Sequence, residues 1–216
     1  MTTQISVDSN ASLLGFPPVV DRRVEVLILG SFPSVASLGK TQYYGHPQNH
    51  FWRLVGAVTG EPLPEMDYER RLKTLLKHHI GLWDIIGTCA REGSLDSAIR
   101  DPRHNDFSRV TRVAKKLRRV CFNGKTAGRM EPLFSEWGFE TVVLPSSSPA
   151  NTMRFDEKLR LWWQIVPAKR AASFDPRPNP PPVRGRERLP SPLKGEGQDG
   201  GWDASRLSPL ASPQKC

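Results

Sequence analysis

The chain has 216 residues and a formal net charge of +9. Its three cysteines, Cys89, Cys121 and Cys216, lie far apart without a CxxC pair, which argues against a disulfide framework and a cysteine-rich zinc or iron–sulfur site. No signal-peptide pattern stands at the start, and no run approaches the roughly 18 apolar residues of a membrane helix, so we expect a cytoplasmic protein.

Composition changes near residue 170. Residues 171–216 hold 9 of the 20 prolines and show no apolar period, which predicts a disordered low-complexity tail. Residues 1–170 form the predicted folded domain and carry 24 Lys and Arg against 17 Asp and Glu. A basic domain favours a polyanionic partner such as nucleic acid, although the same excess also serves ordinary solubility.

Strand and helix patterns alternate along residues 1–170. Short apolar or β-branched runs predict strands at residues 24–29, 80–86, 120–122 and 141–145. Helical apolar spacing follows them at residues 49–58, 68–79, 107–119 and 156–166. This alternation predicts an α/β protein whose parallel sheet is covered on both faces, with ligands bound at the carboxyl ends of the strands.

Polar stretches follow each predicted strand. GSFPS follows the first strand, WDIIGT closes the second, NGK follows the third and PSSSPANT follows the fourth. Hydroxyl groups and backbone N–H groups between two prolines make PSSSPANT suitable for contact with a phosphate backbone, although a solvated turn has the same composition. The stretch TQYYGHPQNHFW, after the first loop, combines stacking rings with histidines and amide groups.

Several reaction types lack their motifs. There is no GxxxxGK[ST] phosphate loop, no nucleophile elbow and no Cys/His pair for a covalent hydrolase. Pro47 separates His46 from His50, and no third ligand accompanies them, so we expect no metal site. The basic run KKLRR at residues 115–119 is typical of a solvated helix face, with DNA contact as the alternative.

The segments LILGSFPS, YYGHPQNHFW, GLWDII, CFNGK and LPSSSPANT, in this order, resemble the uracil-DNA glycosylase superfamily over residues 24–166. The similarity is greatest to its hypoxanthine-DNA glycosylase (deoxyinosine glycosylase) branch, family 6. It implies a three-layer α/β/α fold with a short central parallel sheet. It also implies a monomeric enzyme without cofactor or metal that flips a deaminated nucleotide out of double- or single-stranded DNA and hydrolyses its glycosidic bond.

The resemblance also implies roles for individual residues. Many uracil-excising relatives carry Asn or Asp in the first loop, where this chain has Phe32, so Asn49 becomes the first candidate to orient water. A helix cap is the structural alternative for Asn49, and Asp84 is the second catalytic candidate, as a carboxylate that stabilises positive charge on the sugar. The expected substrate-binding residues are Gly30, Ser31, Phe32, Tyr44, His46 and Asn123. The expected DNA-binding residues are Ser146, Ser147, Ser148, Pro149 and Asn151.

Two other functions stay open at this point. One is a mismatch-type uracil-DNA glycosylase, and the other is a catalytically inactive DNA-binding module of the same fold. Phe32 motivates the second alternative, because a phenyl ring cannot orient water.

Overall fold

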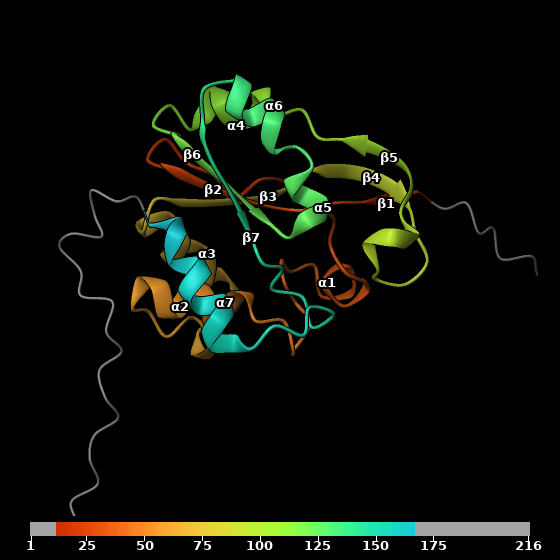
Figure 1. The fold of residues 1–216 in the computed structure, drawn as a ribbon, viewed down its shortest axis with the longest axis horizontal. Coiled ribbons are helices and arrows are strands. Elements are labelled where there is room, and N and C mark those ends of the chain that lie inside the picture. The colour runs from red at the N-terminus through yellow and green to blue at the C-terminus, as the bar shows by residue number, and fades with distance from the viewer. Residues whose placement is uncertain (1–11, 167–216) are drawn as a thin grey trace, which may run out of the picture. The chain divides into compact units, whose positions relative to one another are not determined.

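The computed structural model describes residues 12–166, whose fold is shown in Figure 1. Four strands form a parallel sheet in the order β3-β2-β6-β7. These strands are β2 (Val26–Gly30), β3 (Ile80–Asp84), β6 (Arg119–Asn123) and β7 (Glu140–Leu144). The sheet confirms the expected α/β class. The tail predicted at residues 171–216 lies outside the described residues.

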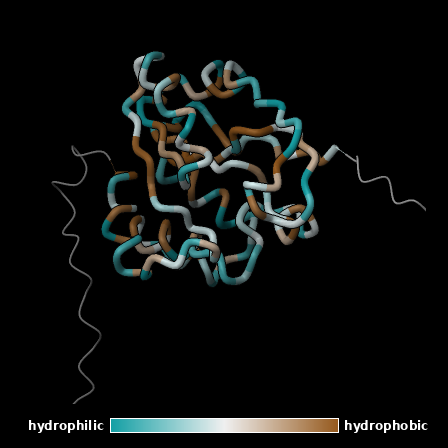
Figure 2. The backbone as a smooth tube through the Cα atoms, turned by 45° about the vertical axis from the view of Figure 1, so that its right-hand side comes forward, coloured by the Kyte–Doolittle hydropathy of each residue, from teal (hydrophilic) through white to brown (hydrophobic). Residues whose placement is uncertain are grey.

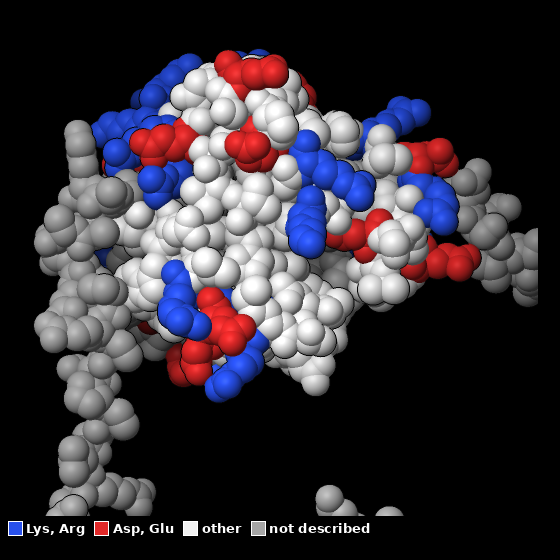
Figure 3. Space-filling view, in the orientation of Figure 1, with Lys and Arg blue, Asp and Glu red and all other residues white. Residues whose placement is uncertain are grey.

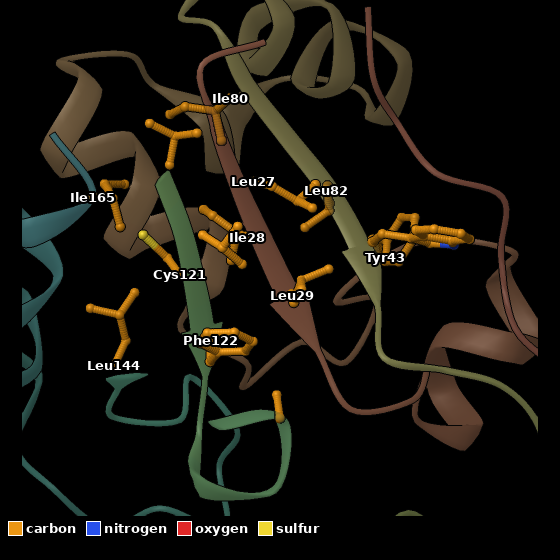
Figure 4. Close-up of a cluster of buried hydrophobic side chains, with 14 of the residues drawn as sticks. Leu27, Ile28, Leu29, Tyr43, Ile80, Leu82, Cys121, Phe122, Leu144 and Ile165 are labelled. Atoms are coloured by element: carbon orange, nitrogen blue, oxygen red, sulfur yellow. The ribbon is translucent and has the colours of Figure 1, made fainter. Parts of the chain in front are cut away.

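The two strands β2 and β3 are buried along their whole length. Their near-continuous apolar sequences are typical of parallel strands that are covered on both faces. Figure 4 shows Leu27 and Leu29 of β2 close to Leu82 of β3, with Phe122 of β6 on the other side of β2. The tube in Figure 2 accordingly is brown where these strands cross the interior of the molecule.

Helices cover both faces of the sheet. Figure 1 shows one group of helices above the sheet and another below it. The first group contains α4 (Ser108–Val113) and α6 (Glu131–Glu136), and the second contains α2 (Phe51–Thr59), α3 (Tyr68–Lys77) and α7 (Phe155–Trp162). Phe134 of α6 packs edge-on against Phe122 at 5.5 Å between ring centroids, and Phe51 packs against Trp162 at 5.8 Å. These layers confirm the three-layer α/β/α fold.

Shorter helical segments complete this part of the chain. They are α1 (Val35–Lys40), α5 (Lys125–Gly128) and the 3-10 turns η1 (Leu63–Glu65), η2 (Asp96–Ala98) and η3 (Trp163–Ile165). Ser34 begins α1 by accepting a hydrogen bond from the Ser37 backbone N–H, and Asp67 begins α3 in the same way through Arg70. Such caps satisfy backbone donors that have no partner inside the helix.

The helix predicted at residues 107–119 is wrong in its length. The helix α4 ends at Val113, and Arg119 already belongs to β6. Arg118 forms an ion pair with Glu25, and Arg119 forms one with Glu140, at the amino ends of the strands. These two arginines therefore lie at the sheet edge opposite the carboxyl ends, where each is paired with a glutamate.

A second, antiparallel sheet was not predicted. It contains β1 (Leu13–Leu14), β4 (Ile86–Ala90) and β5 (Arg100–His104) in the order β1-β4-β5. All five residues of β5 are exposed and include Pro102, so the segment lacks both the alternation and the apolar content that indicate a strand. Within residues 12–166, no helix is long and apolar enough to cross a membrane. Cys89 and Cys121 are both buried free thiols.

Candidate active site

The carboxyl ends of the parallel strands bring three of the predicted site residues to one edge of the sheet. Gly30 is the register partner of Asp84 across β2 and β3, and Asn123 is the partner of Leu144 across β6 and β7. The loops after all four strands therefore begin at the same edge, as the α/β pattern predicted. Side chains on those loops decide the chemistry available there.

Tyr44 stands over this edge in an unusual backbone conformation. Its φ is +54°, a left-handed value that costs free energy for a residue other than glycine and often marks a functional position. Its ring stacks on Phe51 with 3.7 Å between the centroids and 12° between the ring planes. Burial, helped by the charge of Asp84, raises the pKa of Tyr44. The phenol is therefore neutral and keeps a proton to donate.

Asn123 is held in one orientation by three hydrogen bonds. Its Nδ2 donates to the Tyr44 hydroxyl at 3.1 Å and to the Ser147 hydroxyl at 2.8 Å. Its Oδ1 accepts a hydrogen bond from the Ser147 backbone N–H at 2.8 Å, which identifies the oxygen end of the amide. Both amide protons are thus used within the protein. Only the second lone pair of Oδ1 stays available for a ligand.

Asp84 is a buried carboxyl group without a hydrogen-bond partner. Its exposed fraction is 4%, and Oδ2 has no partner among residues 12–166. Gly30 permits this position, because a Cβ there would overlap the carboxyl group. Burial, followed by repulsion from Asp96, raises the pKa of Asp84 to about 7, although Arg91 partly opposes this rise. The group is therefore divided between its acid and carboxylate forms near neutral pH.

The first loop is covered by the segment that follows β4. The Ser31 hydroxyl donates to the Asp96 carboxylate at 2.7 Å, and Arg91 donates to the backbone oxygen of Pro33. The Arg91 guanidinium lies 5.0 Å from the centroid of the Phe32 ring. Phe32 itself is only 6% exposed. Its ring is part of the protein interior, so the expectation that Phe32 lines the substrate site finds no support in its side-chain position.

Asn49 lies in the turn immediately before α2. Its Oδ1 accepts a hydrogen bond from the Phe51 backbone N–H at 3.0 Å, so the side chain does stabilise the first turn of α2. Within residues 12–166 the half-buried amide has no hydrogen-bond partner for its Nδ2, and its oxygen has a second lone pair. The next residue, His50, donates its backbone N–H to the Ser147 oxygen at 3.0 Å. This bond joins the Asn49 loop to the serine loop.

His46 is used locally. Its Nδ1 accepts a hydrogen bond from the Gln48 backbone N–H at 3.2 Å within the turn that precedes Asn49. The ring is half-buried, and its Nε2 forms no hydrogen bond within the described part of the chain. The structure thus places His46 in the loop expected from the sequence, where it shapes the turn.

The serine loop, defined here as residues 145–152, divides into a buried and an accessible part. Ser147 is fully buried and bonded to Asn123, so its side chain cannot reach a phosphate, contrary to the sequence expectation. Ser146 and Ser148 are half-buried, and Pro149 is exposed. Asn151 donates from Nδ2 to the Ser146 backbone oxygen at 3.2 Å, and its Oδ1 accepts from the Met153 N–H at 3.0 Å. Asn151 therefore holds the loop together.

Sequence reasoning missed three charged residues around the edge. Arg91 and Asp96 lie in a stretch without strand or helix periodicity, and they set the electrostatic environment of Asp84. Lys158 lies in α7 and is fully buried. A lysine in an amphipathic helix normally faces solvent, so no local pattern identifies it. Among residues 12–166, no group of three or more His, Cys, Asp or Glu side chains is arranged to hold a metal ion.

Neither the surface charge nor the position of the cavity identifies the carboxyl edge of the parallel sheet as a binding site. Figure 3 shows basic and acidic side chains lying side by side on one face, without a single continuous basic area. A cavity of about 410 Å³ lies near the antiparallel sheet and is lined by residues such as Trp83, Arg103 and Asn105. None of the predicted site residues lines that cavity, so we place the candidate site at the sheet edge.

Comparison with known proteins identifies the family. The uracil DNA glycosylase superfamily model matches residues 17–169. A Methanosarcina acetivorans protein named hypoxanthine DNA glycosylase is 53% identical over 152 residues, which is 70% of this chain and 96% of that protein. A Methanosarcina barkeri protein of the same name is 46% identical over 148 residues, or 68% and 94% of the two chains.

A solved structure gives the same result. The solution NMR structure of a candidate uracil DNA glycosylase from Methanosarcina acetivorans shares 49% sequence identity with this chain, with a TM-score of 0.64. The match covers 72% of this chain and 99% of that one. Together with the family match over most of the described residues, these similarities show that the chain belongs to the uracil DNA glycosylase superfamily.

Proposed function

We propose that this protein is a DNA glycosylase that hydrolyses the glycosidic bond of deoxyinosine and releases hypoxanthine. Membership of the superfamily and the names of the two similar relatives support this proposal. The observation that carries it is the joint arrangement, at one sheet edge, of the stacked Tyr44 phenol, the fixed Asn123 amide and the unpartnered Asp84 carboxyl group.

A flipped purine needs a stacking surface and hydrogen-bonding groups. Phe51 covers one face of the Tyr44 ring, and we assign the opposite face to the base. The Tyr44 hydroxyl, which accepts a hydrogen bond from Asn123, keeps its own proton for an acceptor on the base. Asn123 contributes the free lone pair of Oδ1. Gly30 keeps the floor of this site open, because any side chain there would meet Asp84 and Tyr44.

The chemical step breaks the bond between sugar C1′ and the base nitrogen, and its electron pair leaves with the base. Positive charge develops on the sugar, and the oxygen of a water molecule forms the new bond to C1′. That water molecule loses a proton to solvent or to a general base. We assign the orientation of that water to the Asn49 side chain, whose Oδ1 is held in place by the Phe51 N–H. An amide is too weakly basic to remove the proton itself, so its contribution is positional.

Asp84 is the second catalytic assignment. An ionised carboxylate in this buried position would stabilise the sugar cation strongly, because few dipoles screen it. Its pKa of about 7 means that the charged form becomes dominant only above neutral pH. We therefore expect the rate of base release to rise with pH through this range if Asp84 acts as a charged group.

We assign contact with the DNA backbone to the serine loop. Ser146, Ser148 and Pro149 form its accessible part, and Ser147 and Asn151 support it from within. We propose that the enzyme acts as a cytoplasmic monomer in base excision repair, on double- or single-stranded DNA. We further propose that residues 1–170 suffice for this activity and that residues 171–216 are dispensable.

Cleavage of labelled duplexes tests the proposed activity. Duplexes that carry inosine, uracil or xanthine are incubated with the full chain and treated with alkali, which breaks the strand wherever a base has been released. We expect breaks at inosine and none in a matched undamaged duplex. Breaks mainly at uracil in mismatches would replace the substrate assignment. Binding without breaks at any lesion would identify an inactive DNA-binding module.

A further inference from the structure

The serine loop is attached at both ends to a single helix. Trp162 of α7 donates its indole N–H to the Pro145 backbone oxygen at 3.0 Å, where the loop begins. Lys158, one turn earlier in the same helix, donates its ammonium group to the Asn151 backbone oxygen at 2.7 Å, where the loop ends. Both side chains are fully buried. Because residues four apart share a helix face, α7 holds the two ends of the loop at a constant separation.

We infer that Lys158 is a positioning residue, which fixes the DNA-contacting serine loop through the backbone oxygen of Asn151. This inference rests on the proposed function, since it assigns the loop to DNA. Lys158 does not reach the surface, so it makes no contact with DNA of its own. Its effect passes entirely through the loop that it supports.

Packing alone does not explain a lysine at this position. An ammonium group has three N–H donors, and the Asn151 oxygen is its one hydrogen-bond acceptor recorded among residues 12–166. Burial of a charge with so few partners costs free energy, and a buried apolar side chain of similar volume usually serves stability equally well or better. The charge-assisted bond to the loop is the specific feature that a methionine or leucine would lack.

Asn151 transmits the constraint to the accessible serines. Its backbone N–H donates to the Ser148 oxygen at 3.0 Å, and its Nδ2 donates to the Ser146 oxygen at 3.2 Å. If Lys158 releases the Asn151 oxygen, the segment that carries both accessible serines loses an anchor. Ser147 keeps separate anchors on Asn123 and on the His50 N–H. The base-binding edge and the phosphate-binding loop are therefore held by different contacts.

A neighbouring histidine places Lys158 close to the Asn49 loop as well. Burial, followed by the charges of Lys158 and Arg53, lowers the pKa of His50. His50 precedes α2 and holds the serine loop through its backbone, and its ring packs edge-on against Phe155 of α7 at 5.5 Å between centroids, so the helix that carries Lys158 contacts this junction as well.

Because the base-binding edge and the serine loop are held by different contacts, the variant Lys158→Met can test the inference. We expect the variant to fold with a stability close to that of the wild type, because removal of a poorly partnered buried charge offsets the loss of one hydrogen bond to the Asn151 oxygen. Its Kd for an undamaged duplex should rise by about tenfold or more, because the Asn151 oxygen is no longer held by Lys158 and the serine loop loses an anchor. The single-turnover rate of base release at saturating enzyme should stay within about threefold, because Asn49, Asp84 and Tyr44 keep their contacts.

Arg160→Met is the matched control. Arg160 is exposed on the same helix, and its replacement removes the same formal charge. We expect a Kd within about twofold of the wild-type value at physiological salt, since an exposed charge is screened. Lys158→Arg should restore most of the affinity lost in Lys158→Met. Lys158→Gln, which is shorter and uncharged, should bind weakly and serves as a second variant if the methionine variant fails to fold.

An unchanged Kd in a folded Lys158→Met or Lys158→Gln variant would overturn the inference. So would a rise in Kd accompanied by an equal fall in stability and in saturated rate, which would indicate a purely structural lysine. Affinity for undamaged duplex is measured in every case. A wild-type protein that binds DNA but releases no base would therefore contradict the proposed activity without deciding the role of Lys158.

Discussion

Asp84→Asn probes the most unusual group at the sheet edge. A carboxyl group whose pKa rises from 3.8 to about 7 on folding binds its proton more tightly in the folded protein than in the unfolded chain. Ionisation therefore opposes folding. The penalty is absent below about pH 4, grows as the pH rises, and is complete above about pH 7. Asparagine has nearly the same shape and cannot ionise, so the variant should lack this pH-dependent term.

The magnitude follows from the pKa values. Each pKa unit corresponds to about 1.4 kcal/mol, so the full penalty for the shift from 3.8 to about 7 is about 4 kcal/mol. Between pH 5 and pH 8 the part that develops is about 2.5 kcal/mol. Any fixed cost of an unbonded asparagine amide is the same at both pH values and cancels. The stability of Asp84→Asn relative to wild type should thus increase by about 2.5 kcal/mol from pH 5 to pH 8.

Urea denaturation at both pH values measures this difference. Glu92→Gln is the control, because Glu92 is an exposed carboxylate that follows β4, close in sequence to Arg91. For this control we expect a relative stability that changes by less than about 0.5 kcal/mol, as is usual for surface substitutions. If the relative stability of Asp84→Asn is equally independent of pH, the carboxyl group is already ionised and solvated or paired in the folded protein. Our description of Asp84 would then be wrong.

Three further predictions concern the other site residues. Asn49→Ala should lower stability by about 1 kcal/mol, because the Phe51 N–H at the start of α2 loses its acceptor, and should slow single-turnover base release by roughly a hundred- to thousand-fold. Asn49→Asp should restore stability but change the pH–rate profile, and normal rates in both variants would remove Asn49 from the mechanism. Asn123→Ala leaves the buried Ser147 N–H unbonded, so urea denaturation should show a loss of about 1–3 kcal/mol; an unchanged midpoint would mean that this network is not formed. Affinity for undamaged duplex should fall steeply with added salt because phosphate contacts release counterions; a flat response would contradict a DNA-binding surface.

Local sequence sufficed for the central layer of the fold. The runs at residues 24–29 and 80–86 predict buried parallel strands because they are short and mostly apolar, and the strands β2 and β3 within them are buried along their whole length. The placement of Gly30, Asp84 and Asn123 at one edge follows from this topology alone. Phe51 and Trp52 follow the polar Asn49 loop at the start of α2, and both are buried.

The tertiary structure alone decided which polar groups are accessible and which are partnered. Three consecutive serines are equivalent in sequence, yet only Ser147 is buried, because Asn123 lies opposite it across the sheet edge. Asp84 acquires its raised pKa first from burial and then from Asp96, and Lys158 is buried and bonded to the backbone oxygen of Asn151, seven residues earlier in the chain. Burial and long-range pairing depend on segments distant in the chain, and these distant contacts determine the chemistry of each side chain.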